Sequence, residues 1–195
     1  MKKLFDYIDG LYDAADKRFR REKYWMGIVI HHTGYGSSAP VWKKFFKNIS
    51  AWMAKKDDVY ASAHFHIARE GVNEDDHFAL VDQLVDPTLH ESFHAGKSQW
   101  YHPLLKRIVP DWNRWSIGIE LNGDGNRTPY TKAQINSTVR LIVDLYFRFP
   151  TIDLDKCLVG HSDIAPGRKT DPGFYFPWDE VRSRVKKEIQ DRLAR

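Results

Sequence analysis

Four stretches of the chain carry apolar residues at the spacing of an amphipathic helix. The first spans residues 1–24 and predicts an N-terminal helical extension, and the second spans the strongly aromatic residues 39–55. A third helix is expected to run from its cap Thr131 to about Phe147, and a charged last helix is expected to begin at Pro177. Each would pack its apolar face on a core and leave its polar face to solvent.

Four shorter runs have the residue pattern of β-strands. They are rich in β-branched residues or alternate apolar with polar positions, and turn-forming residues bound them. They span residues 27–32, 61–68, 79–85 and 115–121. Because strands and helices are intermingled along the chain, the predicted fold class is α/β, a single domain with a mixed central sheet flanked by helices. We assign this domain to residues 25–195 and expect its chemistry at the strand ends and the loops that follow them.

The composition is that of an ordinary globular protein. The 195 residues suit one domain, and 42% of them are hydrophobic and 29% charged. No run of about 18 apolar residues occurs, so we expect no membrane insertion. The single Cys157 excludes an intrachain disulfide. The net charge of +4 indicates only a mild preference for polyanions, because the basic residues are spread along the chain.

One segment near the C-terminal end concentrates titratable side chains between turn-forming residues. It reads G-H-S-D-I-A-P-G-R-K-T-D-P-G, and a loop of this kind can bring His161 and Asp171 to a single point. A histidine nitrogen and a carboxylate oxygen are suitable ligands for a first-row metal. His31, at the end of the first predicted strand, can supply a third ligand and leave an open position, as in hydrolytic zinc sites.

Four motifs, in order along the chain, resemble one enzyme family. They are I-V-I-H-H-T, S-A-H-F, W-S-I-G-I-E-L and the segment just quoted, and they cover roughly Ile28 to Trp178. The set is similar to the zinc-dependent N-acetylmuramoyl-L-alanine amidases of type 2. That family includes bacterial cell-wall recycling amidases, phage lysozymes of the amidase kind and peptidoglycan recognition proteins. The resemblance implies hydrolysis of the amide bond between N-acetylmuramic acid and L-alanine, in peptidoglycan or in muropeptides.

The resemblance also implies a set of metal ligands. His31, His161 and Asp171 would bind one Zn²⁺ per chain. His31 is preferred to His32 because the family's ligand is the first residue after the apolar strand. Strand alternation likewise allows only one of these two neighbouring histidines to face the metal.

Two side chains match the catalytic positions of the family. The resemblance implies that Glu120 takes a proton from the attacking water and later hands it to the leaving amine. Lys169 would stabilise the charge that develops on the tetrahedral oxyanion. This chain has Ala63 where phage relatives carry a catalytic tyrosine, so the match is closer to the glutamate-bearing branch.

Three further residues are expected to bind substrate. His94 lies in an H-A-G segment that borders the substrate groove in the family, and His64 is expected to line the site. Arg168 can contact a peptide carboxylate or fix its own loop, and both roles stay open. Asp163 is expected to order the loop as a hydrogen-bond acceptor. The aromatic residues between 100 and 115 are expected mainly in the core, with stacking on sugar rings as the alternative.

Two rival functions explain fewer of these residues. A non-catalytic recognition module of the same fold would bind peptidoglycan without cutting it, but such modules lack a ligand, and all three positions are filled here. A nucleic-acid binder would account only for the pI of about 9.0, and the sequence has no basic cluster interleaved with aromatic residues. No classical export signal is present, so we expect a protein that is cytoplasmic at synthesis. It would be either a muropeptide-recycling enzyme or an endolysin that acts on the wall after release.

Overall fold

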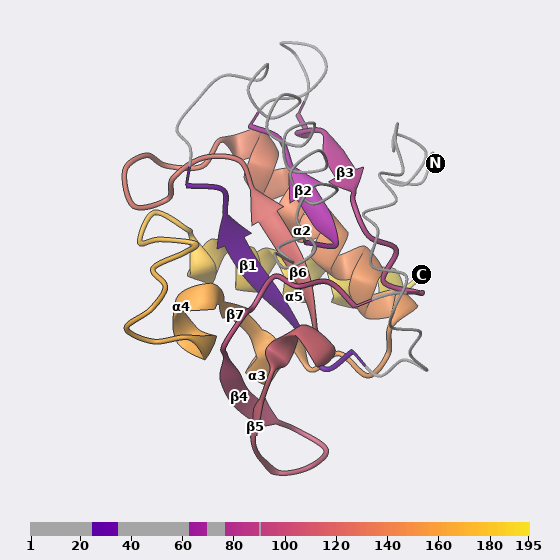
Figure 1. Ribbon diagram of the computed structural model, residues 1–195. Coiled ribbons are helices and arrows are strands. Elements are labelled where there is room, and N and C mark those ends of the chain that lie inside the picture. The colour runs from indigo at the N-terminus through magenta and orange to yellow at the C-terminus, as the bar shows by residue number, and fades with distance from the viewer. Residues whose placement is uncertain (1–24, 35–62, 70–76, 90) are drawn as a thin grey trace.

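The computed structural model describes residues 25–34, 63–69, 77–89 and 91–195, and its centre is a five-stranded sheet (Figure 1). The strand order is β3-β2-β6-β1-β7. The strands are β1 (Gly27–His32), β2 (Phe65–Ile67), β3 (Val81–Gln83), β6 (Ser116–Leu121) and β7 (Leu158–Gly160). Strand β3 is antiparallel to β2, and the other neighbouring strands are parallel. The sheet is therefore mixed, which confirms the predicted fold class.

Two long helices cover one face of the sheet (Figure 1). They are α2 (Lys132–Arg148) and α5 (Trp178–Leu193). Helix α2 begins with a reciprocal pair of hydrogen bonds: the Thr131 hydroxyl accepts from the backbone N–H of Gln134 at 3.2 Å, and Gln134 Oε1 accepts from the N–H of Thr131 at 3.1 Å. The predicted cap at Thr131 and the predicted start of the last helix at Pro177 are both confirmed.

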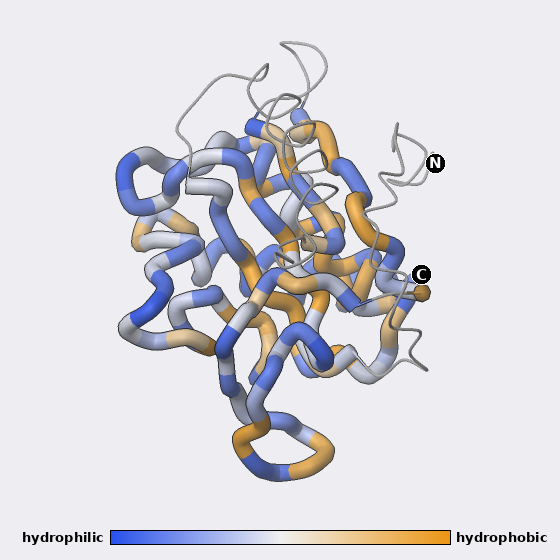
Figure 2. Tube along the Cα trace, viewed as in Figure 1, coloured by the Kyte–Doolittle hydropathy of each residue, from blue (hydrophilic) through white to orange (hydrophobic). Residues whose placement is uncertain are grey.

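Alternation along β1 divides its side chains between the two faces of the sheet. Ile28 and Ile30 lie in the main core, which includes the apolar residues of α2 and α5. Val29 belongs to a smaller cluster on the opposite face. His31 shares the face of Val29, whereas His32 shares the face of the two isoleucines. Apolar residues gather in the strands and the helices behind them, while the outer loops are mostly hydrophilic (Figure 2).

A β-hairpin and three short helical turns complete the described fold. These elements are β4 (Gln99–His102), β5 (Arg107–Pro110), the 3₁₀ turn η2 (Trp112–Arg114), α3 (Leu154–Cys157) and α4 (His161–Ile164). The hairpin extends away from the sheet (Figure 1) and was not predicted, since its exposed residues do not alternate. Trp112 is fully buried, as expected for a core aromatic, whereas Tyr101 is 37% exposed.

Two predicted strands are shorter in the structure, and two predicted helices cannot be compared with it. The regular ladder between β2 and β3 ends where the His64 carbonyl accepts from both Leu84 N and Val85 N, at 2.8 and 3.3 Å. Residues 1–24 and 39–55 lie outside the described part of the chain. The domain boundary at residue 25 therefore stays a prediction. Within the described part, no helix combines the length and apolar character needed to cross a membrane.

Candidate active site

The register of the sheet places four titratable residues in one row across neighbouring strands. Asp82 on β3 pairs with His66 on β2, His66 pairs with Glu120 on β6, and Glu120 pairs with His31 on β1. Paired residues of neighbouring strands project from the same face of a sheet. His161 follows directly on β7, the strand beyond β1. Titratable side chains from four strands and from the start of α4 therefore lie close together on one face of the sheet.

Two imidazoles and one carboxylate converge at the end of this row. His31 Nδ1 lies 2.9 Å from His161 Nδ1 and 3.0 Å from Asp171 Oδ2, and His161 Nδ1 also lies 3.0 Å from Asp171 Oδ2. All three side chains are buried. The loop from Gly160 to Gly173 thus folds back as predicted, although it contains the one-turn helix α4.

This donor set fits a divalent metal ion. Two nitrogens and a carboxylate oxygen are typical zinc ligands, and ligands about 2.1 Å from a tetrahedral ion lie about 3.4 Å from one another. The three observed separations of 2.9 to 3.0 Å need only a small outward shift to reach that value. Among the residues that the structure describes, His31, His161 and Asp171 form the group suited to hold a metal ion.

The charges of the ligand atoms also suit a cation. Burial alone would raise the pKa of Asp171, but its close contacts with the His161 and His31 rings and the charges of these rings hold that pKa far below its usual value. Burial lowers the pKa of His31 to about 4, against the opposing hydrogen bond to Asp171. At neutral pH, Asp171 is therefore ionised and His31 is neutral, the states in which both can bind a metal.

Glu120 is a partly buried carboxyl group beside these ligands. Burial raises its pKa to about 8, the negative charge of Asp171 adds to the rise, and the charge of Lys169 opposes it. Its Oε2 atom has no hydrogen-bond partner among the described residues. A buried, unpaired carboxylate oxygen is costly, so this atom calls for a partner such as water or a cation. The unpaired oxygen of Glu120 is therefore a further feature of the site that suits a metal ion and its bound water.

A hydrogen bond within the loop Gly160 to Gly173, which carries two of the candidate ligands, helps to order it. Asp163 Oδ2 accepts from the backbone N–H of Gly160 at 2.7 Å, in agreement with its predicted ordering role. Lys169 is exposed on the same loop. Arg168 Nη2 donates to the carbonyl oxygens of Ala95 and Lys97, at 2.8 and 2.7 Å. Arg168 thereby joins the loop to the segment that precedes β4.

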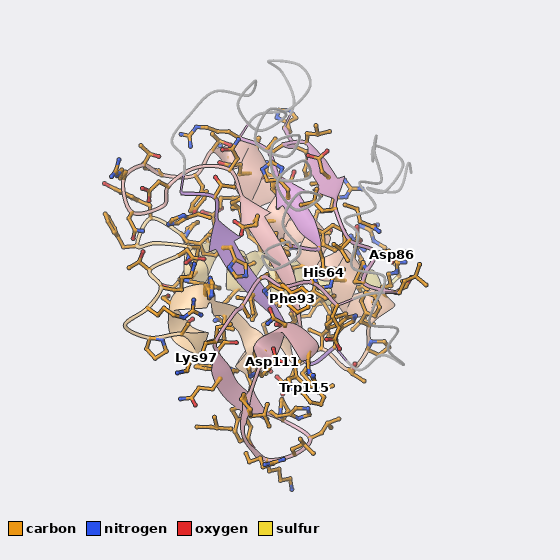
Figure 3. The ribbon with its side chains drawn as sticks, in the orientation of Figure 1. His64, Asp86, Phe93, Lys97, Asp111 and Trp115 are labelled. Carbon is orange, nitrogen blue, oxygen red and sulfur yellow. The ribbon has the colours of Figure 1, made fainter. Side chains whose placement is uncertain are left out.

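His64 and His94 lie behind the ligands and are buried. His64 Nδ1 accepts from the backbone N–H of Gly118 at 3.0 Å, and its ring centroid lies 5.9 Å from that of His94. His94 Nδ1 lies 2.9 Å from His31 Nε2. The segment that leads into β4 crosses the sheet on the face opposite to α2 and α5 (Figure 1). Its residues Phe93 and Lys97 are labelled in Figure 3, together with His64.

Three parts of the site were not identified from the sequence. The place of His66 in the row depends on strand register, and the roles of the Ala95 and Ser116 carbonyls belong to the backbone, which no motif reveals. His66 Nδ1 lies 3.3 Å from Asp82 Oδ2. The alternation of the S-A-H-F-H-I run places His64 and His66 on one face, but it does not show which strand lies beside them.

Fold and site together define a class of protein. A mixed sheet carries, at the ends of its parallel strands, a buried His/His/Asp set suited to one metal ion, with an unpaired glutamate next to it. This is the arrangement of a mononuclear metal hydrolase, in which three protein ligands leave a position open.

Comparison with known proteins identifies the family. The family model described as N-acetylmuramoyl-L-alanine amidase matches residues 21–174, so the chain belongs to the N-acetylmuramoyl-L-alanine amidase family Amidase_2. A 1,6-anhydro-N-acetylmuramyl-L-alanine amidase AmpD of Haemophilus influenzae is 46% identical over 143 residues, which are 73% of this chain and 68% of that relative.

Two solved structures share the fold. A selenomethionine derivative of AmpD is 28% identical with a TM-score of 0.60, and the match covers 84% of this chain and 86% of that one. The amidase AmiD from E. coli, in complex with anhydro-N-acetylmuramic acid-L-Ala-D-γ-Glu-L-Lys, is 27% identical with a TM-score of 0.61, over 86% of this chain and 61% of that one. The family and the fold implied by the sequence motifs are confirmed.

Proposed function

We propose that this protein is a zinc-dependent amidase that hydrolyses the bond between N-acetylmuramic acid and L-alanine in muropeptides. The observation that carries the proposal is the convergence of His31, His161 and Asp171, with separations of 2.9 to 3.0 Å, beside the partly buried Glu120. Membership of the amidase family supports the reaction, and the similarity to AmpD and AmiD supports anhydro-muropeptides as the substrate class. A recycling enzyme is therefore favoured over an endolysin.

The ligand set of the proposal is the buried triad. His31, His161 and Asp171 would hold one Zn²⁺ through Nδ1, Nδ1 and Oδ2, the atoms that converge in the structure. When bound, zinc supplies a water of lowered pKa, from 15.7 toward about 7, and polarises the scissile carbonyl.

Glu120 is the acid–base group of the proposal. Its position beside the ligands and its unpaired Oε2 suit it to accept a proton from the attacking water. The same carboxyl would then donate that proton to the departing amine of L-alanine, since burial raises its pKa to about 8 and favours its protonated form. The positive charge of Lys169 lowers the pKa of Glu120 and would stabilise negative charge on the substrate carbonyl oxygen.

The expected substrate contacts stay part of the proposal. Arg168 is exposed at the edge of the site, where its guanidinium can meet a peptide carboxylate while Nη2 holds two backbone carbonyls. His64 and His94 are buried on the same face of the sheet as His31, so any contact they make with substrate would be at the base of the site. The domain from residue 25 onward would contain all of these groups.

The proposal is tested with a defined anhydro-muropeptide. We expect the purified chain to release the peptide from anhydro-N-acetylmuramyl-L-Ala-D-γ-Glu-L-Lys, to lose this activity with a chelator and to regain it with Zn²⁺. The His31→Ala variant should be inactive under all three conditions, whereas the exposed His77→Ala variant should behave as the native chain. Binding of the muropeptide without cleavage would favour the recognition module, and faster cleavage of intact sacculi would favour the endolysin.

A further inference from the structure

The ring of His94 connects the proposed metal ligand His31 to the backbone carbonyl of Ser116. His31 Nε2 lies 2.9 Å from His94 Nδ1, and His94 Nε2 lies 3.1 Å from Ser116 O. The rings of His31 and His94 meet edge to face, with centroids 5.0 Å apart. All three residues are buried, so the contacts are shielded from water.

The chemistry of these contacts determines which nitrogen carries each proton. A carbonyl oxygen can only accept, so His94 Nε2 must donate to Ser116 O. The Ser116 hydroxyl donates to Trp112 O at 2.5 Å, so it offers His94 Nε2 only an acceptor. A His31 ring that binds a metal through Nδ1 carries its proton on Nε2, so it can only donate from Nε2. His94 Nδ1 therefore accepts from His31 Nε2.

The contact with His94 and metal binding therefore require the same tautomer of His31. With its proton on Nε2, His31 exposes the lone pair of Nδ1, the atom that faces His161 and Asp171. Ligating histidines usually donate their other ring N–H to an outer acceptor, which fixes the tautomer and the ring orientation. Here the outer acceptor is a second histidine, and its own tautomer is set by a strand carbonyl.

Ala95, the residue after His94, provides the outer acceptor for the other imidazole, that of His161. His161 Nε2 lies 3.1 Å from Ala95 O, so His161 also donates through Nε2 and exposes Nδ1 to the metal position. Arg168 Nη2 donates to the same carbonyl at 2.8 Å, and a carbonyl has two lone pairs. Gly96 adopts φ +55°, a conformation that favours glycine, and this lets the segment turn toward Arg168.

The sheet is shaped to receive the His94 ring. A Cβ atom added to Gly118 would lie 2.4 Å from His94 Cγ and 2.8 Å from His94 Cβ. Only glycine at this position of β6 leaves room for the ring between the strand and His31. The glycine of the W-S-I-G-I-E-L motif therefore has a packing reason that links it to the metal ligands.

We propose that His94 and the Ala95 carbonyl form the orienting outer layer of the metal site, and that His94 is a positioning residue that fixes the tautomer of His31. This inference rests on the metal site of the proposed function. It assigns the H-A-G segment a task in metal binding, because two consecutive residues each direct one imidazole.

Substitutions of His94 that place a polar atom at the position of Nδ1 or at the position of Nε2 test the proposal. Asparagine Oδ1 is the same number of bonds from the backbone as histidine Nδ1, so it can accept the hydrogen bond from His31. The amide atoms of glutamine are one bond further out, at the position of histidine Nε2. We expect His94→Leu and His94→Gln to weaken Zn²⁺ binding about 10- to 100-fold, and His94→Asn to lose less than about tenfold. Affinity is measured on the full chain by competition with a chromophoric chelator, and geometry by the absorption spectrum of the Co²⁺-loaded protein.

A second buried histidine supplies the matched control. His102 is 2% exposed and packs edge to face on Trp115, on the β4 hairpin. The His102→Leu variant should keep the native zinc affinity and Co²⁺ spectrum. Thermal melts of the metal-free variants show whether each one folds, and if His94→Leu does not fold, the Asn and Gln pair decides the result.

Two outcomes would overturn the inference. Native zinc affinity in His94→Leu would show that His31 needs no outer acceptor, and equal losses in His94→Asn and His94→Gln would show that Nδ1 is not the atom that matters. The proposed function fails in a different way: the native chain would then bind Zn²⁺ no more tightly than His31→Ala.

Discussion

Glu120 lies directly opposite His31 in the register of two neighbouring parallel strands, β6 and β1. Side chains at paired positions project from the same face, so a candidate base and a candidate ligand are neighbours by backbone geometry alone. A shift of the register by one residue would turn Glu120 to the apolar face that holds Ile119. The pairing of β1 with β6 thus positions this candidate pair independently of the loops.

Replacement of Glu120 by glutamine should abolish most activity without unfolding the protein. Glutamine has nearly the same shape but cannot carry a proton between water and amine, so we expect kcat to fall about 100- to 10,000-fold. Initial rates on an anhydro-muropeptide measure the loss, and circular dichroism melts report the fold. The exposed Glu180, which pairs with Arg184, provides the control Glu180→Gln. A Glu120→Gln enzyme within tenfold of the native rate would contradict the assigned role.

Removal of the metal should destabilise the native chain. An ion that binds only the folded protein adds RT ln(1 + [L]/Kd), about 2.7 kcal/mol at a free concentration 100 times Kd. Urea unfolding with zinc and with a chelator measures this difference. The Asp171→Asn variant, which lacks the anionic ligand, should show a smaller difference. Identical unfolding curves of the native chain in both conditions would argue against a site at the triad.

A methyl group at Gly118 should overpack the space occupied by the His94 ring. The added Cβ would come within 2.4 Å of His94 Cγ, an atom close to the backbone that cannot swing away, so we expect Gly118→Ala to cost about 1–3 kcal/mol of unfolding free energy. In the double variant with His94→Ala the overlap with the ring disappears, and only the 2.8 Å contact with the Cβ atom of residue 94 remains. The two substitutions should therefore be strongly non-additive in denaturant unfolding, and simple additivity would disprove the contact.

Acid should destabilise the metal-free protein partly through His66. Burial lowers the pKa of His66 below 6.5, against the hydrogen bond and charge of Asp82. A lowered folded-state pKa means that stability is present above pH 6.5 and is lost as the pH falls toward the folded value. One residue can contribute up to about 1.4 kcal/mol per pH unit in that window.

The measurement compares unfolding free energies at pH 7.5 and pH 5.5 on metal-free protein. His66→Asn should lose less stability between these values than the native chain, because it removes one buried group that must be protonated. The exposed His77→Asn variant is the control and should follow the native chain. An unchanged pH dependence in His66→Asn would show that this imidazole is not held neutral by the fold.

The sequence by itself determined the class of fold and the family, and it predicted three candidate ligands whose side chains converge in the structure. Periodicity located the helix after Thr131 and the strand Gly27–His32. Strand alternation allowed only one of His31 and His32 to face a metal, and the resemblance to the family favoured His31. These features are local, since they depend on residues only a few positions apart. The loop from Gly160 to Gly173 could be predicted to fold back because its prolines and glycines restrict the backbone.

Only the tertiary structure decided how the site is supported. The pairing of His31 with Glu120, and of Glu120 with His66, depends on strand order and register, which join segments far apart in the chain. The acceptors of His94 and His161 are backbone carbonyls, and every residue carries one, so no residue type marks them. Long-range register and backbone contacts leave no trace in local composition, which is why the ligands were predictable and their orientation was not.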